Sequence, residues 1–585
     1  MDRIKIMSED LSNKIAAGEV VERVANVIKE LVENSIDAKS TNIKIDLVSS
    51  GLSEIKVTDD GIGMNSSDAL NAFKRHATSK IFKTEDLFFI NTLGFRGEAL
   101  PSIASVSKVT METSEKDEGT KIVIEGGTLK EHGLCSARRG TMISVKDLFY
   151  NTPARLKYLK SEQTELSNTT FYLEKLALSY PNIAFTLTNN QDIIIKTSGS
   201  GNLLKTIHEI YGIEVSKNMV EITGSNDDYD VYGYICKPTI LKSNRNYMTT
   251  IVNNRVVKNA ELNKAINDAY HTYKPDIRFP IVVITINTDP TLIDVNIHPT
   301  KQDIKFSKED GLCNLISHLI KDALYKALLI PKIEVKTKEE SNNEIAIKEA
   351  FDYPETLIVN DDLIPKVSEE SPIIKEETLD FKLNEKNEEV KHLELYPCGL
   401  VFGTYIVAQN EESMFLIDQH AAQERINYER VLKALREEKI TTTDLLFPIS
   451  IEFSPSDYLK LKDKINTIEE LGFKIEEFGI NTIIVKTHPT WLIEGYEESQ
   501  IRTILDLIIN MSTNFDKVKF QDHLAATAAC KMSVKGNEAT TTEQAESLLN
   551  DLVKCDNPYN CPHGRPTIIS FTRYELERMF KRVMN

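Results

Sequence analysis

The sequence is informative first through what it lacks. Its 585 residues contain no apolar run near the roughly 20 residues that a membrane-spanning helix needs, so we expect no membrane partner. The charged start is not followed by an apolar core, which argues against a secretory signal. The 7 cysteines are too few and too scattered for the disulfide scaffold of a secreted protein. These absences predict a cytoplasmic protein.

A surplus of positive charge is missing as well. The formal net charge is −18, so the chain is not a basic coat for nucleic acid, and any DNA binding must use local basic patches. Much of the acidity gathers in residues 331–391, which hold 17 acidic and 9 basic side chains. We interpret this stretch as a disordered acidic linker between two globular halves, with a solvated helix as the alternative.

Both halves show regular hydrophobic patterns. The length predicts several domains, because a single core stops growing at about 250–300 residues. Before the linker, apolar-periodic helices alternate with short β-branched strands, with a helix expected over 20–36 and strands over 43–47, 55–58 and 122–124. After the linker we expect two strands around a turn at 410–413, then a helix, and further helices near 455–471 and 498–511 that flank a strand at 482–489.

One polar pair stands on the first expected helix. Glu30 and Asn34 are four residues apart and therefore lie side by side, opposite the apolar positions. A carboxylate can deprotonate a water molecule, and an amide oxygen can ligate magnesium without adding charge. A plain surface pair is the alternative, and for an isolated pair it is the commoner one.

A carboxylate and two glycines follow the strand over 55–58. Asp59 falls at the strand tip, and Gly61 and Gly63 allow a flat ring to approach the backbone. The carboxylate can accept a hydrogen bond from an exocyclic amine such as that of adenine. A simple glycine turn explains the motif equally well, and the GxGxxG spacing of dinucleotide-binding folds is absent.

Two later segments, 75–81 and 93–100, combine glycine with positive charge. This combination suits a lid that covers phosphates. Thr141, in front of another expected strand, can also contact a nucleotide. Each segment taken alone is more simply an ordinary surface loop. The lid residues are Lys80, Gly94, Arg96 and Gly97.

A second polar cluster opens the helix that follows the linker. Asp418 and His420 are two residues apart, and His420 and Glu424 share one helical face. This mixture of carboxylate and imidazole suits a divalent metal. Glu429 falls on the opposite face of an unbroken helix, so we do not expect it to be a direct ligand.

Sulfur and a further imidazole occur near the end of the chain. Cys561 and His563 form a Cys-x-His pair in a Pro/Gly-rich loop, which is a good zinc half-site. Cys530 taken singly is more often a core thiol. Considered together with the cluster at 418–424, these residues favour a metal site.

Several of these segments resemble the motifs of one family nearly letter for letter. They are KELVENSIDA, DDGIGM, RHATSKI, TLGFRGEAL and DLFYNTPAR in the first half, and DQHAAQERINYE and CPHGRP in the second. The chain resembles the MutL family of DNA mismatch-repair proteins over 1–330 and 392–585. One departure is Val24, where the family usually has proline.

The resemblance implies roles at an ATP site. Glu30 would be the general base, Asn34 the magnesium ligand and Asp59 the reader of adenine. Lys301 resembles the lysine that reaches the γ-phosphate from the second domain, a task that suits a point charge on a flexible stem. The other implied ATP-binding residues are Gly61, Gly63, Thr78, Ser79, Lys80, Gly94, Arg96, Gly97 and Thr141.

The resemblance also implies a multidomain α/β and α+β architecture. It consists of a GHKL (Bergerat) ATPase α/β sandwich at 1–209, a ribosomal-S5-like α/β transducer domain at 210–330, and the linker. A C-terminal α+β dimerisation and endonuclease domain would occupy 392–585, with a regulatory subdomain at about 449–529.

The implied function is ATP-gated mismatch repair with magnesium as the ATPase cofactor and a latent nicking endonuclease. Asp418 would be catalytic, with manganese and zinc held by Asp418, His420, Glu424, Cys530, Cys561 and His563. The implied partners are DNA (hence the nucleoid), a MutS-type mismatch-recognition protein, a second copy of the chain and a sliding clamp. Candidate DNA contacts are Arg155, Lys157, Lys160, Arg245, Arg255 and Lys258.

The clamp-binding segment departs from the family pattern. It corresponds to 443–448, where Thr443 replaces the usual glutamine. Two rival functions also stay open at this stage. A chaperone or topoisomerase subunit would share the ATP motifs but has no need of DQHA and CPHGRP. A matchmaker without nuclease activity would keep the metal cluster as structural zinc.

Overall fold

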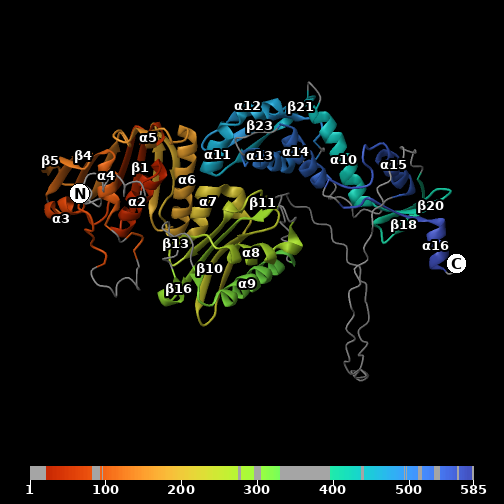
Figure 1. The fold of residues 1–585 in the computed structure, drawn as a ribbon, viewed down its shortest axis with the longest axis horizontal. Coiled ribbons are helices and arrows are strands. Elements are labelled where there is room, and N and C mark those ends of the chain that lie inside the picture. Colours follow the sequence, from red (N-terminus) through yellow and green to blue (C-terminus); the bar gives the residue numbers. More distant parts are fainter. Residues whose placement is uncertain are drawn as a thin grey trace, which may run out of the picture. The chain divides into compact units, whose positions relative to one another are not determined.

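A computed structural model gives the fold (Figure 1). It describes residues 21–81, 92–94, 97–116, 118–274, 278–294, 305–329, 395–436, 440–492, 495, 497–510, 517–532, 541–562, 565–580 and 582. The predicted linker at 331–391 lies outside the described residues, as do Arg96, Lys301 and His563. Among the helices of the described part, none is long and apolar enough to cross a membrane.

An eight-stranded sheet forms the first domain, in the order β5-β4-β3-β6-β2-β1-β7-β8. Its neighbours are antiparallel except for the parallel pair β1 and β7. The strands are β1 (Asn42–Val48), β2 (Glu54–Asp59), β3 (Lys108–Ser114), β4 (Gly119–Glu125), β5 (Thr128–Cys135), β6 (Gly140–Lys146), β7 (Ala184–Asn189) and β8 (Asp192–Lys196). The strands predicted over 43–47, 55–58 and 122–124 are confirmed.

Helices pack on this sheet through their apolar faces. In α2 (Val24–Asp37), Val24, Ile28 and Leu31 are buried at helical spacing and share a core with Ile45 of β1. The predicted helix is therefore confirmed, although it begins at Val24 rather than at residue 20. The other helices of the domain are α3 (Ser66–Asn71), α4 (Ala99–Ser105), α5 (Pro153–Leu156) and α6 (Glu162–Ser179).

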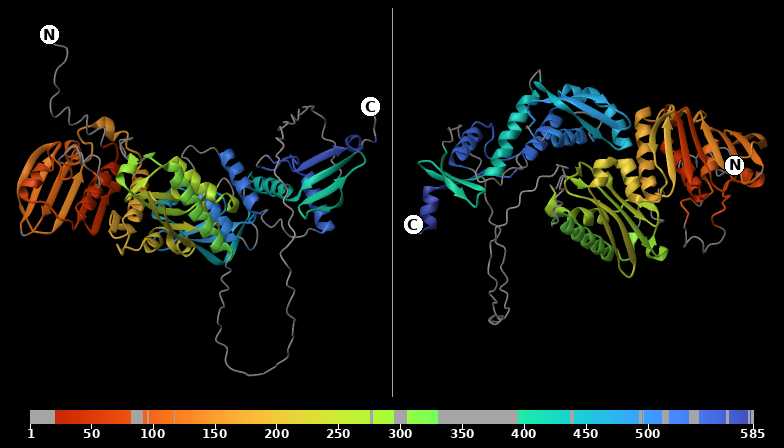
Figure 2. Two further views of the ribbon diagram at one scale, coloured as in Figure 1. Left: turned by 90° about the horizontal axis from the view of Figure 1, so that it is seen from below. Right: turned by 180° about the vertical axis from the view of Figure 1, so that it is seen from behind.

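A five-stranded sheet, β13-β12-β15-β10-β9, forms the second domain. Helices α8 (Ala260–Ala269) and α9 (Glu309–Leu329) cover one of its faces, as both views of Figure 2 show. Cys236, Ile251 and Val283 join the core of the first domain. The elements are α7 (Leu203–Lys217), β9 (Met219–Ser225), β10 (Tyr229–Cys236), β12 (Met248–Val252), β13 (Arg255–Val257), β15 (Val282–Thr288) and the short strands β11 (Leu241–Lys242), β14 (Phe279–Pro280), β16 (Ile293–Asp294) and β17 (Lys305–Phe306).

The C-terminal region contains two small sheets. The first, β18-β19-β20-β24, comprises β18 (Tyr396–Val401), β19 (Tyr405–Gln409), β20 (Ser413–Asp418) and β24 (Ile568–Thr572). The second, β21-β23-β22, comprises β21 (Thr442–Glu452), β23 (Thr482–Pro489) and β22 (Lys474–Glu477). Helix α10 (Gln419–Arg436) starts at the end of β20 and buries Val431 and Leu435 in the core beneath the second sheet.

The remaining C-terminal helices complete an α+β fold. They are α11 (Pro455–Lys462), α12 (Ile465–Glu470), α13 (Glu497–Ile509), α14 (Lys517–Met532), α15 (Thr542–Val553) and α16 (Arg573–Met579). The stretch 455–471 forms two helices, because the backbone of Lys464 (φ −117°, ψ 12°) leaves helical values. The predicted multidomain α/β and α+β architecture is confirmed.

Candidate functional sites

The carboxylate of Asp59 lies where β2 ends, and the fold almost encloses it. Ser35 Oγ donates to Oδ2 at 2.7 Å, and Ser40 Oγ donates to Oδ1 at 3.2 Å. The backbone N–H groups of Gly61 and Thr141 also donate to Oδ1, at 2.9 and 3.3 Å. Burial raises the pKa of Asp59, and the hydrogen bond from Ser35 partly offsets this. The structure therefore brings Asp59, Gly61 and Thr141 together.

The next residue, Asp60, binds the backbone at the start of the neighbouring strand, β1. It accepts the N–H groups of Thr41 and Asn42 at 2.7 and 2.9 Å and the hydroxyl of Thr41 at 2.6 Å. The hydrogen bonds from Thr41 and Asn42 outweigh the effect of burial and lower the pKa of Asp60 to about 2. Asp60 thus fixes the start of β1 beside the end of β2 and so supports Asp59. Its role was not predicted from the sequence.

Two of the predicted glycines are required by close backbone contacts. A Cβ at Gly63, where φ is +69°, would lie 2.0 Å from the carbonyl oxygen of Ser114. A Cβ at Gly97, where φ is +61°, would lie 2.3 Å from the carbonyl oxygen of Ala77. Gly97 also accepts the N–H of His76 at 3.1 Å, so the segments 75–81 and 97–100 are joined.

The C-terminal end of α2 gathers the predicted phosphate and metal groups. Lys80 Nζ donates to Asn34 Oδ1 at 3.0 Å. A Cβ at Gly94 would lie 3.5 Å from this ammonium and 3.9 Å from Asn34 Oδ1, so Gly94 faces both. Thr78 Oγ1 accepts the N–H of Lys80 at 3.2 Å, whereas Ser79 is exposed. Asn34, Thr78, Lys80 and Gly94 are therefore brought together.

The predicted base, Glu30, lies one helical turn before Asn34 on α2 and is partly buried. A second acid on the same helix, Glu33, has a different environment. Its Oε1 accepts the hydroxyl proton of Tyr172 at 3.0 Å. Burial, followed by the neighbouring charge of Glu33, raises the pKa of Tyr172. Glu33 is thus engaged in packing α6 against α2.

The second predicted cluster begins α10. Asp418 Oδ1 accepts the N–H groups of His420 and Ala421 at 2.9 and 3.0 Å, and so caps the helix. His420 Nε2 lies 3.5 Å from Glu424 Oε1, and Glu424 is only 4% exposed. Asp418, His420 and Glu424 are therefore neighbours, as their spacing predicts.

Helix α10 also holds the segment that leads to Cys561. Glu429 accepts the N–H groups of Asp556 and Asn557 at 2.7 and 3.2 Å. Arg425 Nε donates to the carbonyl oxygen of Asn560 at 2.5 Å. Helix α10 is unbroken, and Glu429 binds backbone instead of joining the cluster at its start. Nothing in the local sequence signals these contacts across more than 120 residues.

The described residues do not complete the metal site by themselves. No group of three or more His, Cys, Asp or Glu side chains in the described part of the chain is arranged to hold a metal. Cys561 is buried, at 2% exposure, while His563 and the side chain of Cys530 lie outside what the structure describes. Burial, with Glu429 nearby, raises the pKa of the Cys555 thiol to about 12.

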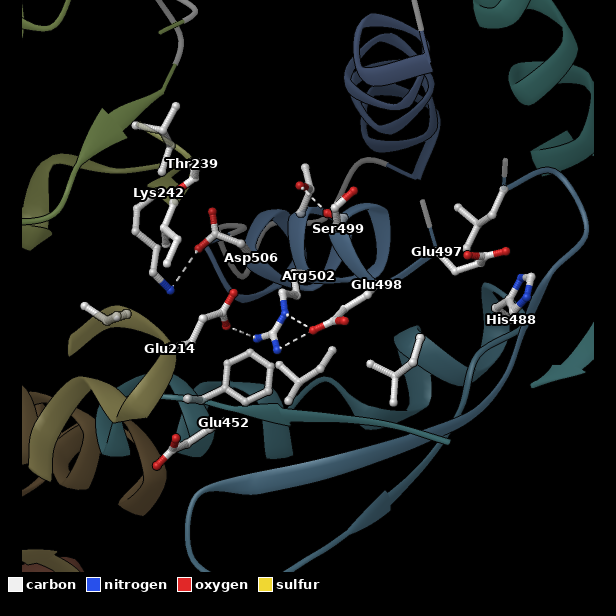
Figure 3. A pocket seen from close by; sticks show the side chains of 18 of the residues that line it. Glu214, Thr239, Lys242, Glu452, His488, Glu497, Glu498, Ser499, Arg502 and Asp506 are labelled. Atoms are coloured by element: carbon white, nitrogen blue, oxygen red, sulfur yellow. Dashed lines mark hydrogen bonds and ion pairs between the residues drawn. The ribbon is translucent and has the colours of Figure 1, made fainter. Parts of the chain in front are cut away.

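Two surfaces of the C-terminal region expose apolar side chains. The register of β21 with β23 shifts between Asp444 and Ile449, and between them Leu446 and Phe447 are 88% and 79% exposed. On α13, Arg502 Nη2 donates to Glu498 Oε1 at 2.8 Å (Figure 3). Leu446 and Phe447 belong to the predicted clamp-binding segment. Other exposed apolar side chains lie on or next to β18, β19, β24 and α16, and they are Tyr396, Phe402, Tyr405, Ile569, Tyr574 and Phe580.

Comparisons with known proteins agree with this architecture. Residues 22–146 match the family described as histidine kinase-, DNA gyrase B- and HSP90-like ATPase. Residues 207–325 match the C-terminal domain of DNA mismatch repair protein, and residues 398–540 match the MutL C-terminal dimerisation domain. The first domain is therefore an ATPase domain of the GHKL class, and the C-terminal region is a dimerisation domain.

Two relatives extend the match to the whole chain. DNA mismatch repair protein MutL of Listeria innocua is 44% identical over 600 residues, which cover 99% of each chain. DNA mismatch repair protein MutL of Geobacillus sp. is 42% identical over 620 residues, which cover 100% of each chain. An ATPase domain, a mismatch-repair domain and a dimerisation domain thus occur in the same order along the full length, and the chain belongs to the MutL family of DNA mismatch-repair proteins.

Proposed function

We propose that this chain uses ATP hydrolysis to control its engagement with DNA, and that its C-terminal region nicks DNA in a metal-dependent reaction. The observation that supports the first part is the meeting of Asn34, Lys80 and Gly94 at one end of α2, with Asp59 enclosed nearby. In this proposal Asp59 accepts the amine of adenine, and Asn34 holds the magnesium ion. The ammonium of Lys80 offsets phosphate charge.

Glu30 supplies the base in this mechanism. It precedes Asn34 by one helical turn, so the carboxylate and the metal ligand lie side by side along α2. A water molecule between Glu30 and the terminal phosphate can give its proton to the carboxylate as it attacks. Lys301 and Arg96, which we propose as further phosphate contacts, lie outside the described residues.

The nicking activity would depend on the start of α10. Asp418, His420 and Glu424 offer hard oxygen and nitrogen donors, and the buried Cys561 offers a soft one. This donor set fits manganese and zinc, with His563 and Cys530 as the remaining proposed ligands. A bound metal would stabilise the attacking and leaving oxygens of the phosphodiester.

The surfaces suggest where partners bind. The basic residues proposed for DNA include Lys157, Lys160, Arg245 and Lys258, whose side chains are exposed. The apolar surface on β18, β19, β24 and α16 is our candidate for the contact between two copies. The exposed Leu446 and Phe447 of segment 443–448 are our candidates for sliding-clamp contacts. A MutS-type protein is a further proposed partner, and the proposed location is the nucleoid.

The decisive experiment is manganese-dependent nicking of supercoiled plasmid. Asp418→Asn keeps the shape of the side chain and removes its charge, so nicking should be lost while ATP turnover stays near the unmodified rate. The matched control is Asp551→Asn, an exposed residue of the same region that pairs with Lys554 at 3.2 Å, and it should nick normally. Full nicking by Asp418→Asn would remove Asp418 from the proposed catalytic site. If the unmodified chain binds zinc but does not nick, the result would instead favour a matchmaker with a structural zinc site.

A further inference from the structure

Asp37, the last residue of α2, is an acid in an unfavourable place. The C-terminal end of a helix carries partial negative charge, and α2 has no basic residue in its last turn. The side chain of Asp37 is nevertheless only 8% exposed. A buried carboxylate at this position needs a cation and hydrogen-bond donors from elsewhere in the chain.

Those groups come from the two segments that form the phosphate end of the ATP site. Lys80 Nζ donates to Asp37 Oδ2 at 2.5 Å. The N–H groups of Leu93 and Gly94 donate to Oδ1 and Oδ2 at 3.0 and 3.2 Å. One carboxylate therefore fixes Lys80 and the backbone at Gly94 in the same place.

The contacts of Asp37 converge on the proposed magnesium ligand. The ammonium of Lys80 is shared between Asp37 and Asn34 Oδ1, which lies 3.0 Å from it. Asn34 Oδ1 is the atom that would hold the magnesium ion, so the ammonium of Lys80 lies beside the group proposed to bind the metal. Without Asp37, the flexible Lys80 stem would lose the contact that aims its charge at this point.

The second domain contacts the same segment. Arg255 Nη2 on β13 donates to the carbonyl oxygen of Thr92, the residue before Leu93. The backbone at 92–94 is therefore held from α2 on one side and from the second domain on the other.

We propose that Asp37 is a positioning residue of the ATPase, which orients Lys80 and the Gly94 backbone toward the phosphates of the nucleotide whose magnesium Asn34 would hold. The proposal rests on the ATP site proposed above. Asp37 does not touch the nucleotide in this proposal and acts through Lys80. Its loss should therefore weaken binding of magnesium–ATP more than it slows the chemical step.

A double-mutant cycle tests this proposal in the full-length protein. Asp37→Asn and Lys80→Gln should each raise the equilibrium dissociation constant of a non-hydrolysable magnesium–ATP analogue about tenfold, because a charge-assisted contact is lost. KM for magnesium–ATP should rise by the same factor, with kcat changed less than about threefold. The double variant should be little worse than Lys80→Gln alone, because Asp37 acts through Lys80 and has nothing left to orient once the ammonium is gone. Independent effects that multiply in KM would overturn the proposal, as would an unchanged KM for Asp37→Asn.

The control is Asp147→Asn, which makes the same substitution in the same domain. Asp147 also pairs with a lysine, Lys108, at 2.8 Å, but the pair is exposed and outside the site. Its KM should stay within about twofold of the unmodified value. If Asp37→Asn does not fold, Lys80→Gln tests the proposal instead. A KM for magnesium–ATP within about twofold of the unmodified value would show that Lys80 does not contribute to binding, and Asp37 would then have no ammonium to orient. Asn34→Ala distinguishes failure of the proposed ATP site from failure of the proposal for Asp37. Metal-dependent ATP turnover by Asn34→Ala would refute the ATP site itself. If only the double-mutant cycle gives the wrong result, the positioning role of Asp37 alone is refuted.

Discussion

At the proposed ATP site, Asp59 receives hydrogen bonds from two serines and two backbone groups, and Asn34 meets Lys80 at the end of a well-packed helix. At the C-terminal cluster, Asp418 Oδ1 is engaged in capping α10, and the segment leading to Cys561 is held through Glu429 and Arg425. The first site is built on one sheet and one helix, to which two further segments add Lys80 and Gly94. The second is built on a helix and a distant loop. Substitutions of the proposed catalytic residues should therefore change activity without changing stability more often at the first site than at the second.

The largest effect should come from the proposed base. Glu30→Ala removes the carboxylate but none of the proposed nucleotide contacts, so turnover should fall about 10²–10⁴-fold while ATP still binds. Steady-state hydrolysis and equilibrium binding measure the two quantities. The control Glu131→Ala alters an exposed acid that pairs with Lys121, and it should hydrolyse normally. Unchanged turnover by Glu30→Ala would assign the base to another residue.

Asp59→Asn should affect binding rather than turnover. The amide keeps the shape of the side chain, but its NH₂ group faces hydrogen-bond donors, and the charged acceptor for adenine is lost. Affinity for ATP should fall about ten- to a hundredfold, because this is the loss in binding expected when one hydrogen bond to a charged group is removed. Titration with a non-hydrolysable ATP analogue measures it. If the analogue binds Asp59→Asn as tightly as the unmodified chain, Asp59 does not read adenine.

Glu429→Gln tests whether one substitution at the second site changes both stability and nicking. Loss of the charge that holds Asp556 and Asn557 should lower the free energy of unfolding of the C-terminal region by about 1–3 kcal/mol. Nicking should weaken too, because the segment before Cys561 is less well held. Calorimetric melting and plasmid nicking are measured together. Glu577→Gln, which alters an exposed pair with Arg573, should change stability by under about 0.5 kcal/mol. Normal stability of Glu429→Gln would argue that the loop needs no such support.

The smallest effect should come from Asp60→Asn. The pKa of Asp60 is lowered from 3.8 to about 2, so the ionised form stabilises the folded state above pH 3.8. This contribution should be lost as the pH falls through about 2. The group is partly exposed, so we expect about 1 kcal/mol at neutral pH. Urea unfolding at pH 7 and pH 2.5 compares the variant with the unmodified chain. A difference that grows toward acid would contradict this assignment.

Local patterns predicted the elements that carry the ATP site, because α2 and β2 follow simple periodicities and Asp59 stands at a strand tip. The contacts that hold those residues could not be predicted in this way. Ser40, Asp37 and Thr92 act on groups that only the folded chain brings close, and no spacing in the sequence signals them. At the second site, α10 was predicted from DQHA onward, and Glu429 was rightly separated from the cluster. Its bonds to Asp556 and Asn557 depend on the path of the chain between them.

The core shared by the first two domains matters for anyone who wants to study them as fragments. Cys236, Ile251 and Val283 are fully buried among residues of the first domain, and α7 (Leu203–Lys217) runs across the point where one would cut between the two domains. A fragment that stops near residue 209 would end inside this helix and expose an apolar face. Such a fragment should express poorly and aggregate, whereas a fragment that extends to Leu329 keeps the whole core and is the better choice for crystallisation and nucleotide-binding work.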